Sequence, residues 1–263
     1  MKNKFIVLSL FIIFIFNIYC PAMAASSEPE LNASAAALID LTNEHFLYES
    51  NIDQAIEPGG LVKLMTAIIA MEHISDKSAT ITVSADSIDS YDYSFGNMGI
   101  LANENLTYED LIHGLLLYDA GDAAEVLAST VVRSRDKFIN EMNNKAVEIG
   151  ALNTKFTNPT GFPEKNQYST VEDLYKITKY AISKPYFAEI VEKSRYEMSP
   201  TNKYSEYRYL DNKNKFMNVS TTDKYFTSKA KGVKTSYIDD NNCGLILHYE
   251  NDNLNLLELL FYQ

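Results

Sequence analysis

The sequence predicts a mixed α/β fold in which an antiparallel sheet is flanked by helices and joined to an all-helical lobe. Segments with strand-like alternation lie at both ends of the chain, whereas the middle carries apolar residues at helical spacing. No internal repeat and no linker rich in Pro or Gly divides the sequence. We therefore expect one mixed domain whose sheet is closed by strands from both ends.

The first ordered segments read as a hairpin. Residues 25–33 are small and polar and predict a flexible leader, so order is expected to begin near Ser34. Apolar segments at 35–41 and 46–49 then lie on either side of the polar turn at 42–45. The spacing predicts a helix over 61–74.

The middle of the chain predicts further helices, and the last part predicts strands. The expected helices are 108–117, 123–132, 135–149, which ends at Gly150, and 171–183, which follows a Ser-Thr cap. The expected strands are 232–237, 243–249 and 254–262.

The first 24 residues are typical of a secretion signal. Lys2 and Lys4 precede an apolar run over 5–19, and Ala-Met-Ala at 22–24 forms a cleavage site. A run of 15 residues is short for a membrane span, which needs about 20. A lipoprotein signal is the alternative because Cys20 follows the run, although Tyr19 is bulky for that motif. We expect an extracytoplasmic protein of the cell envelope.

The mature composition limits the possible partners. Without residues 1–24 the chain has 21 basic and 35 acidic residues, a formal charge of −14, which disfavours nucleic acid and anionic membrane surfaces. Cys243 would then be the single cysteine, expected in a buried strand, so an internal disulfide is excluded. The four histidines lack paired metal-ligand spacing, and we expect no metal and no cofactor.

Several segments carry a resemblance to one protein family. FINEMNNKA at 138–146, TKFTNPTGF at 154–162 and YSTVEDL at 168–174 resemble, in order, the FVxxMNxKA, TxFxNPxGL and YSTxxDL segments of the D-alanyl-D-alanine carboxypeptidases. These are the low-molecular-mass penicillin-binding serine peptidases. The resemblance runs from about Ser34 to Leu247 and implies a β-lactamase/transpeptidase-like domain over 34–263.

The family's first catalytic motif is altered. EPGGLVKLMTA at 57–67 resembles PASxxKxMTA, in which serine is the nucleophile and lysine its base. Lys63 is retained as the ancestral base, but Gly60 stands at the nucleophile position and carries no oxygen. Taken alone, Lys63 would be an ordinary helix lysine.

The second and third motifs are altered as well. LLLYDAGDAA at 115–124 places Asp119 and Gly121 at the serine and asparagine of the family's SxN motif. GVKTSY at 232–237 resembles the KTG strand, whose lysine and threonine bind the substrate carboxylate; Lys234 and Thr235 are kept, and Ser236 replaces the glycine. We expect Ser236 to protrude where a ligand backbone would lie. Asp119 is either a plain loop residue or a partner of Lys63.

The losses together predict a pseudoenzyme, because a missing nucleophile removes the acyl-enzyme step. The leading hypothesis is that the protein binds peptidoglycan stem peptides or a wall protein. The backbone N–H groups of Gly60 and Tyr237 would remain as oxyanion donors, and Lys234 and Thr235 would bind a carboxylate. The alternative is an active hydrolase in peptidoglycan maturation, with Asp119 activating water. A third class is a purely structural interaction protein whose old pocket is closed.

The end of the chain gives one more expectation. The family continues from its final strand into a covering helix and often a second domain, whereas here the strand at 254–262 is followed by Gln263 alone. We expect one apolar sheet face and the edge near Leu256 to Phe261 to contact a protein partner or a second copy in a homodimer.

Overall fold

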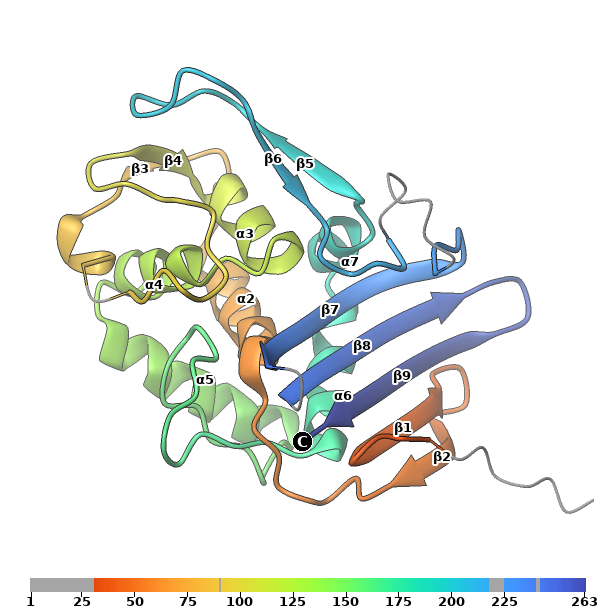
Figure 1. Ribbon diagram of the computed structural model, residues 1–263. Coiled ribbons are helices and arrows are strands. Elements are labelled where there is room, and N and C mark those ends of the chain that lie inside the picture. Colours follow the sequence, from red (N-terminus) through yellow and green to blue (C-terminus); the bar gives the residue numbers. More distant parts are fainter. Residues whose placement is uncertain (1–30, 90, 218–224, 240–241) are drawn as a thin grey trace, which may run out of the picture. The chain divides into compact units, whose positions relative to one another are not determined.

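The computed structural model describes residues 31–263 apart from 90, 218–224 and 240–241 (Figure 1). The described residues from Ala33 onward belong to one compact unit. The predicted signal over 1–24, with Cys20, and most of the predicted leader lie outside the described residues.

A five-stranded antiparallel sheet forms one layer of this unit (Figure 1). Its strand order is β2-β1-β9-β8-β7. The strands are β1 Ala35–Asp40, β2 His45–Ser50, β7 Ala230–Asp239, β8 Asn242–Glu250 and β9 Asn255–Tyr262. The predicted hairpin and the three predicted C-terminal strands are therefore confirmed, and the sheet is closed from both ends of the chain.

Helices cover one face of the sheet and build the lobe beside it (Figure 1). They are α2 Val62–His73, α3 Tyr108–Leu117, α4 Gly121–Thr130, α5 Arg135–Ile149, α6 Val171–Ile182 and α7 Pro185–Val191. The first nine residues of α2, through Ala70, are all buried, so this helix runs through the centre of the unit. The predicted mixed α/β fold class is confirmed.

Local sequence signals explain where these helices begin and end. Thr107 and Asp110 form a capping box at the start of α3, and Thr170 accepts a hydrogen bond from the Asp173 N–H at the start of α6. Gly150 ends α5 with a φ of 88°, a left-handed conformation that favours glycine. Each signal lies within four residues of the helix end that it fixes, which is why these bounds could be predicted.

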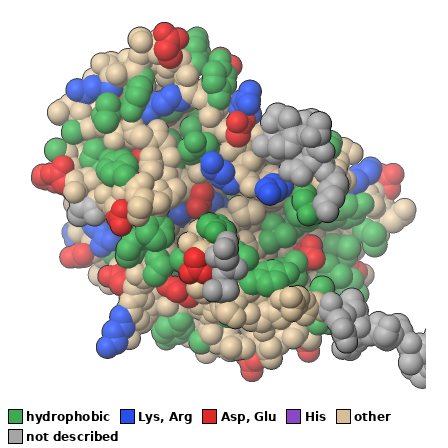
Figure 2. Space-filling model, viewed as in Figure 1, with side chains coloured by type: hydrophobic (Ala, Val, Ile, Leu, Met, Phe, Trp, Pro, Cys, Tyr) green, Lys and Arg blue, Asp and Glu red, His purple; other side chains and the backbone are tan. Residues whose placement is uncertain are grey.

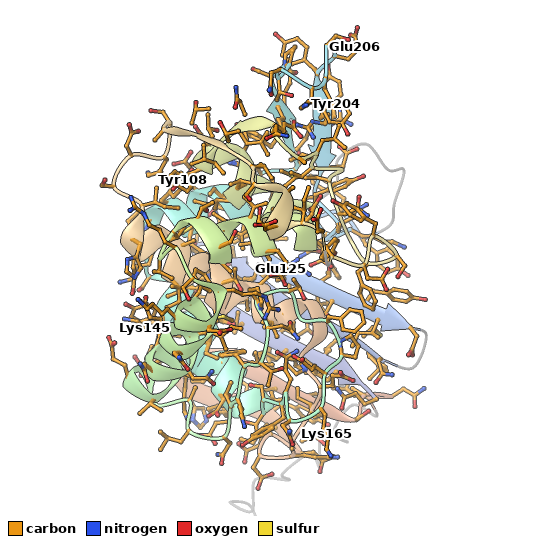
Figure 3. The ribbon with its side chains drawn as sticks, turned by 90° about the vertical axis from the view of Figure 1, so that its left-hand side faces the viewer. Tyr108, Glu125, Lys145, Lys165, Tyr204 and Glu206 are labelled. Atoms are coloured by element: carbon orange, nitrogen blue, oxygen red, sulfur yellow. The ribbon has the colours of Figure 1, made fainter. Side chains whose placement is uncertain are left out.

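Two small two-stranded sheets and the short helix α7 were among the elements that the sequence analysis did not predict. They are β3 Thr80–Thr82 with β4 Asn105–Thr107, β5 Arg195–Met198 with β6 Arg208–Asp211, and α7. Pro185 at the first position of α7 was the available signal. The β5–β6 hairpin carries Tyr204 and Glu206 in its loop, at the top of the view in Figure 3. Among the described residues, no helix combines the length and apolar character that a membrane span requires.

The position of β9 corrects the expectation for the end of the chain. β9 pairs with β1 on one side and β8 on the other, so its backbone is not an edge open to a partner. Leu257 and Leu259 are buried on the helix side, whereas Leu256 and Leu260 face the other side and are partly exposed. Contact of that outer face with a partner or a second copy stays a prediction.

Cys243 corrects a smaller expectation. It lies in β8 as predicted, but it is partly exposed rather than buried. Its neighbours across the sheet are Tyr237 on β7 and Tyr262 on β9. The side chain therefore belongs to the face of the sheet that the helices leave uncovered.

The alternation of buried and partly exposed residues along β9 predicts losses of stability of different size for two neighbouring substitutions. Leu259→Lys should lower the free energy of unfolding by more than about 3 kcal/mol, because it buries an unpaired ammonium among apolar side chains. Leu260→Lys should lower it by about 1 kcal/mol or less, since its side chain reaches solvent. Urea unfolding followed by circular dichroism measures both, and equal losses would contradict the assigned facing.

Candidate functional site

Three segments that are far apart in the sequence meet at one end of β7. The short helix η1, Gly59–Leu61, and the first turn of α2 supply Gly60 and Lys63. Asp119 lies in the turn between α3 and α4, and Lys234 and Ser236 are buried residues of β7. The structure thus brings the three altered motifs together.

A carboxylate bridges two buried lysines at the centre of this site. Asp119 Oδ1 lies 3.1 Å from Lys63 Nζ and 2.5 Å from Lys234 Nζ. The side chains of Lys63 and Lys234 are 6% and 1% exposed, and that of Asp119 is 21% exposed. The predicted ion pair between Lys63 and Asp119 is confirmed. Lys234 as the second partner was missed, because the resemblance assigned it to a ligand carboxylate.

The charges of this triad are mutually dependent. Burial acts to raise the pKa of Asp119, but the ammonium groups of Lys234 and Lys63 outweigh it and hold that pKa below its usual range. Burial lowers the pKa of Lys234, and the Asp119 carboxylate opposes this shift. The carboxylate therefore makes it possible to bury both lysines.

Asp119 also occupies the space beside Gly60. A Cβ placed on Gly60 would lie 2.9 Å from Asp119 Oδ1 and 3.1 Å from Oδ2. Contacts under about 3 Å require one group to move, and here the carboxylate is held by two lysines. Asp119 itself has a φ of 63°, a left-handed conformation that aspartate tolerates better than most residues. Position 60 therefore suits glycine as long as Asp119 keeps its place.

A tyrosine fills the corresponding space at Gly121. A Cβ on Gly121 would lie 2.2 Å from the Tyr91 hydroxyl oxygen. That hydroxyl donates a hydrogen bond to the Gly96 carbonyl at 2.6 Å, and the Gly121 N–H donates to the same carbonyl at 2.7 Å. Tyr91 was missed by the sequence analysis, and no sequence signal linked residues 91 and 121.

The retained Asp122 fixes the segment that carries Tyr91 and Gly96. It is buried, and its carboxylate accepts hydrogen bonds from the backbone N–H groups of Met98 and Ile100. Burial raises its pKa, and these hydrogen bonds act in the opposite direction. Asp122 therefore has a structural role next to the altered positions.

Ser236 corrects two expectations about the oxyanion donors and the ligand path. Its Oγ accepts a hydrogen bond from the Gly60 N–H at 2.7 Å, so this N–H is already satisfied within the protein. Ser236 is buried and lies against Gly59 and Gly60 instead of protruding into the pocket. The β7 residues that line the pocket are instead Thr235, Tyr237 and Ile238.

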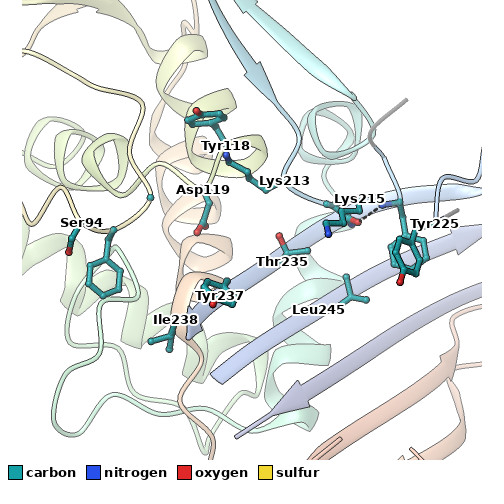
Figure 4. A pocket seen from close by; sticks show the side chains of 14 residues that line it. Ser94, Tyr118, Asp119, Lys213, Lys215, Tyr225, Thr235, Tyr237, Ile238 and Leu245 are labelled. Atoms are coloured by element: carbon teal, nitrogen blue, oxygen red, sulfur yellow. Dashed lines mark hydrogen bonds between the residues drawn. The ribbon is translucent and has the colours of Figure 1, made fainter. Parts of the chain in front are cut away.

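A pocket of about 850 Å³ opens beside the triad (Figure 4). Its lining is largely aromatic and apolar, with Asp119 and Thr235 on one side and two lysines nearby. The lining residues are Ser94, Phe95, Gly96, Tyr118, Asp119, Lys213, Asn214, Lys215, Phe216, Tyr225, Thr235, Tyr237, Ile238 and Leu245. Figure 2 shows Lys and Arg side chains around the hollow between the helical lobe and the sheet. Within the described part of the chain, no cluster of His, Cys, Asp or Glu could hold a metal ion.

Removing the central carboxylate should destabilise the protein in a pH-dependent way. Asp119→Asn should lower the free energy of unfolding at pH 7 by roughly 3 kcal/mol, because two buried ammonium groups lose their counter-charge. Burial lowers the pKa of Lys234, and without Asp119 nothing opposes this shift, so the pKa of Lys234 in the folded state falls further below that in the unfolded chain. The unfolded chain then binds more protons, so the variant should regain stability as the pH rises toward about 10.

Thermal unfolding of Asp119→Asn and wild type at pH 7 and in mildly alkaline buffer tests this. Asp53→Asn, at an exposed position, is the control and should be neutral. A constant difference between Asp119→Asn and wild type at all pH values would contradict the triad electrostatics.

Comparisons with known proteins agree with the geometry. A family model described as D-alanyl-D-alanine carboxypeptidase matches residues 22–260. The D-alanyl-D-alanine carboxypeptidase DacF of Bacillus subtilis is 27% identical over 239 residues, which cover 90% of this chain and 59% of that protein. DacB2 of Mycobacterium tuberculosis, with the same description, is 30% identical over 164 residues, covering 62% of this chain and 55% of that protein. The chain thus spans less than two thirds of the length of either relative.

Solved structures show the same fold. A D-alanyl-D-alanine carboxypeptidase from Mycobacterium tuberculosis has a TM-score of 0.77 at 23% identity, covering 89% of this chain and 84% of that chain. Penicillin-binding protein 6B of Escherichia coli has a TM-score of 0.76 at 23% identity, covering 89% of this chain and 72% of that chain. Because the family model matches nearly the whole sequence, the chain belongs to the D-alanyl-D-alanine carboxypeptidase family.

Proposed function

We propose that this protein is a noncatalytic, extracytoplasmic member of its family that binds the D-Ala-D-Ala end of a peptidoglycan stem peptide without cleaving it. The observation that carries the proposal is the Asp119 carboxylate, which fills the space beside Gly60 and holds both motif lysines. The names of the relatives support the ligand class, and the signal-like sequence over 1–24 supports the location.

The chemistry of the site supports loss of turnover. A serine-type mechanism needs a hydroxyl near a lysine that can accept its proton. Gly60 provides no hydroxyl, Lys63 is bound to a carboxylate, and the Gly60 N–H is bonded to Ser236. Several requirements of the reaction are therefore unmet at once.

The alternative, a hydrolase in which Asp119 activates water, has less support. A general base works best when its pKa lies near the working pH. The two ammonium groups hold the pKa of Asp119 below its usual range and already engage its Oδ1 atom. Such a carboxylate is a weak base, so the geometry favours binding over catalysis.

The pocket supports binding of a peptide carboxylate. Its volume of about 850 Å³ lies within the range of roughly 300–1,000 Å³ that is usual for ligand sites. Thr235 offers a hydroxyl beside the triad, in which two lysines share the single carboxylate of Asp119. Aromatic side chains such as Tyr118 and Tyr237 line the remaining walls and suit the apolar methyl groups of alanine.

The first test is binding without turnover. Calorimetric titration with a synthetic pentapeptide ending in D-Ala-D-Ala should give saturable binding, and prolonged incubation should release no D-alanine. Treatment with a β-lactam should leave the mass of the intact protein unchanged, because no acyl bond can form at Gly60. An active carboxypeptidase of the family is the positive control. Release of D-alanine, a covalent mass increase or absence of binding would each overturn the proposal.

The second test restores the missing nucleophile. Gly60→Ser alone should remain inactive, because the new Cβ would collide with Asp119, whose carboxylate would stay bound to both lysines. Gly60→Ser combined with Asp119→Ser removes that collision. The side-chain amide of the family's SxN asparagine is still missing, because Gly121 stands at its position and Tyr91 fills its space. The acylation rate with a fluorescent penicillin measures each variant. Rapid acylation of the single variant would show that Asp119 does not block the site.

A further inference from the structure

Two lysines are presented at the pocket by an anchored segment that follows β6. Asn212 and Asn214 are buried, and the Asn212 side-chain amide donates to the Lys193 carbonyl at 2.9 Å. The Lys213 N–H donates to the Leu117 carbonyl at 2.9 Å, which ties the segment to the end of α3. Lys213 and Lys215 are exposed at this anchored backbone, and both line the pocket (Figure 4).

Neither lysine forms an ion pair with a carboxylate of the described residues. Lys213 Nζ lies 4.1 Å from the centre of the Tyr118 ring, a cation–π contact that keeps it beside the pocket. Among the lining residues that the structure describes, Asp119 is the single acid, and it is already paired with Lys63 and Lys234. In a chain with a formal charge of −12, the pocket is therefore locally positive.

The positive charge is divided between two places. At the triad next to Thr235 two lysines share one carboxylate, and two further lysines, Lys213 and Lys215, form the second place. A peptide with a single terminal carboxylate would match the first place and leave the second unmatched. A peptide with an additional side carboxylate would match both.

Resting on the proposed function, we propose that Lys213 and Lys215 bind a second carboxylate of the peptide, remote from its D-alanine terminus. The site then selects stem peptides whose glutamate keeps a free carboxylate over those in which it is an amide. The two lysines act as specificity-determining residues, and the triad with Thr235 receives the terminus.

The experiment compares matched peptides. Two pentapeptides ending in D-Ala-D-Ala differ only in a γ-linked glutamate whose α-carboxyl is free in one and amidated in the other. A third peptide keeps the free carboxylate and lacks both D-alanines. Calorimetric titration should show the free acid binding about fivefold to tenfold more tightly than the amide, since one charge-assisted contact is lost. Higher salt should reduce this difference.

Variants assign the difference to the two lysines. Lys213→Gln combined with Lys215→Gln should remove the preference for the free acid, because the affinity for the acid should fall by more than the affinity for the amide. Lys155→Gln combined with Lys165→Gln makes the same change in net charge at exposed positions outside the pocket lining, and should keep the preference. Lys165 lies at the lower end of the molecule in Figure 3, opposite the β5–β6 hairpin. Equal melting temperatures confirm that the variants fold.

The outcomes separate the two proposals. Equal affinity of wild type for acid and amide overturns the role of the lysines and leaves the proposed function standing. If the third peptide binds as tightly as the free-acid pentapeptide, recognition of the D-Ala-D-Ala end is overturned. A preference for the acid over the amide that depends on the two lysines would still support the second contact. Binding of none of the three peptides overturns both.

Discussion

The bridge from Asp119 to Lys63 and Lys234 is the interaction on which the rest of the site depends. Two ammonium groups buried close together repel each other, and each loses hydration, so neither would stay charged there without a counter-charge. Asp119 provides it through one oxygen atom that both lysines contact. The two motif lysines are therefore accommodated in the folded state by Asp119, and this role does not require that either lysine takes part in catalysis.

The three altered motif positions are complementary to one another. Asp119 fills the space beside Gly60, Tyr91 fills the space beside Gly121, and Ser236 bonds the N–H of Gly60. Each added group occupies space or satisfies a hydrogen bond that the shorter residue leaves open. Well-packed interiors have few voids, so simple deletion of the catalytic groups would leave a destabilised centre. The site is better described as rebuilt for stability than as merely damaged.

The sequence predicted what depends on local patterns. The helix over 108–117 and the helix over 135–149 were predicted with the observed bounds, because caps and helical spacing act within a few residues. The pairing of Lys63 with Asp119 was predictable from motif alignment. Tyr91 in the place of a missing asparagine side chain, and β9 in the middle of the sheet, were not, because both depend on contacts between segments remote in sequence.

The pocket beside the triad is the feature that favours the proposed binding function over a purely structural role. If the ancestral site served only as packing, side chains would be expected to fill the cavity as they fill the spaces at Gly60 and Gly121. A cavity of about 850 Å³ instead remains beside the filled centre, with exposed lysines and aromatic walls. Exposed cations and apolar walls do little for the stability of the folded chain, whereas together they complement a peptide that carries both methyl groups and carboxylates. This arrangement supports the proposed function, in which the centre stabilises the fold and the adjoining cavity binds the peptide.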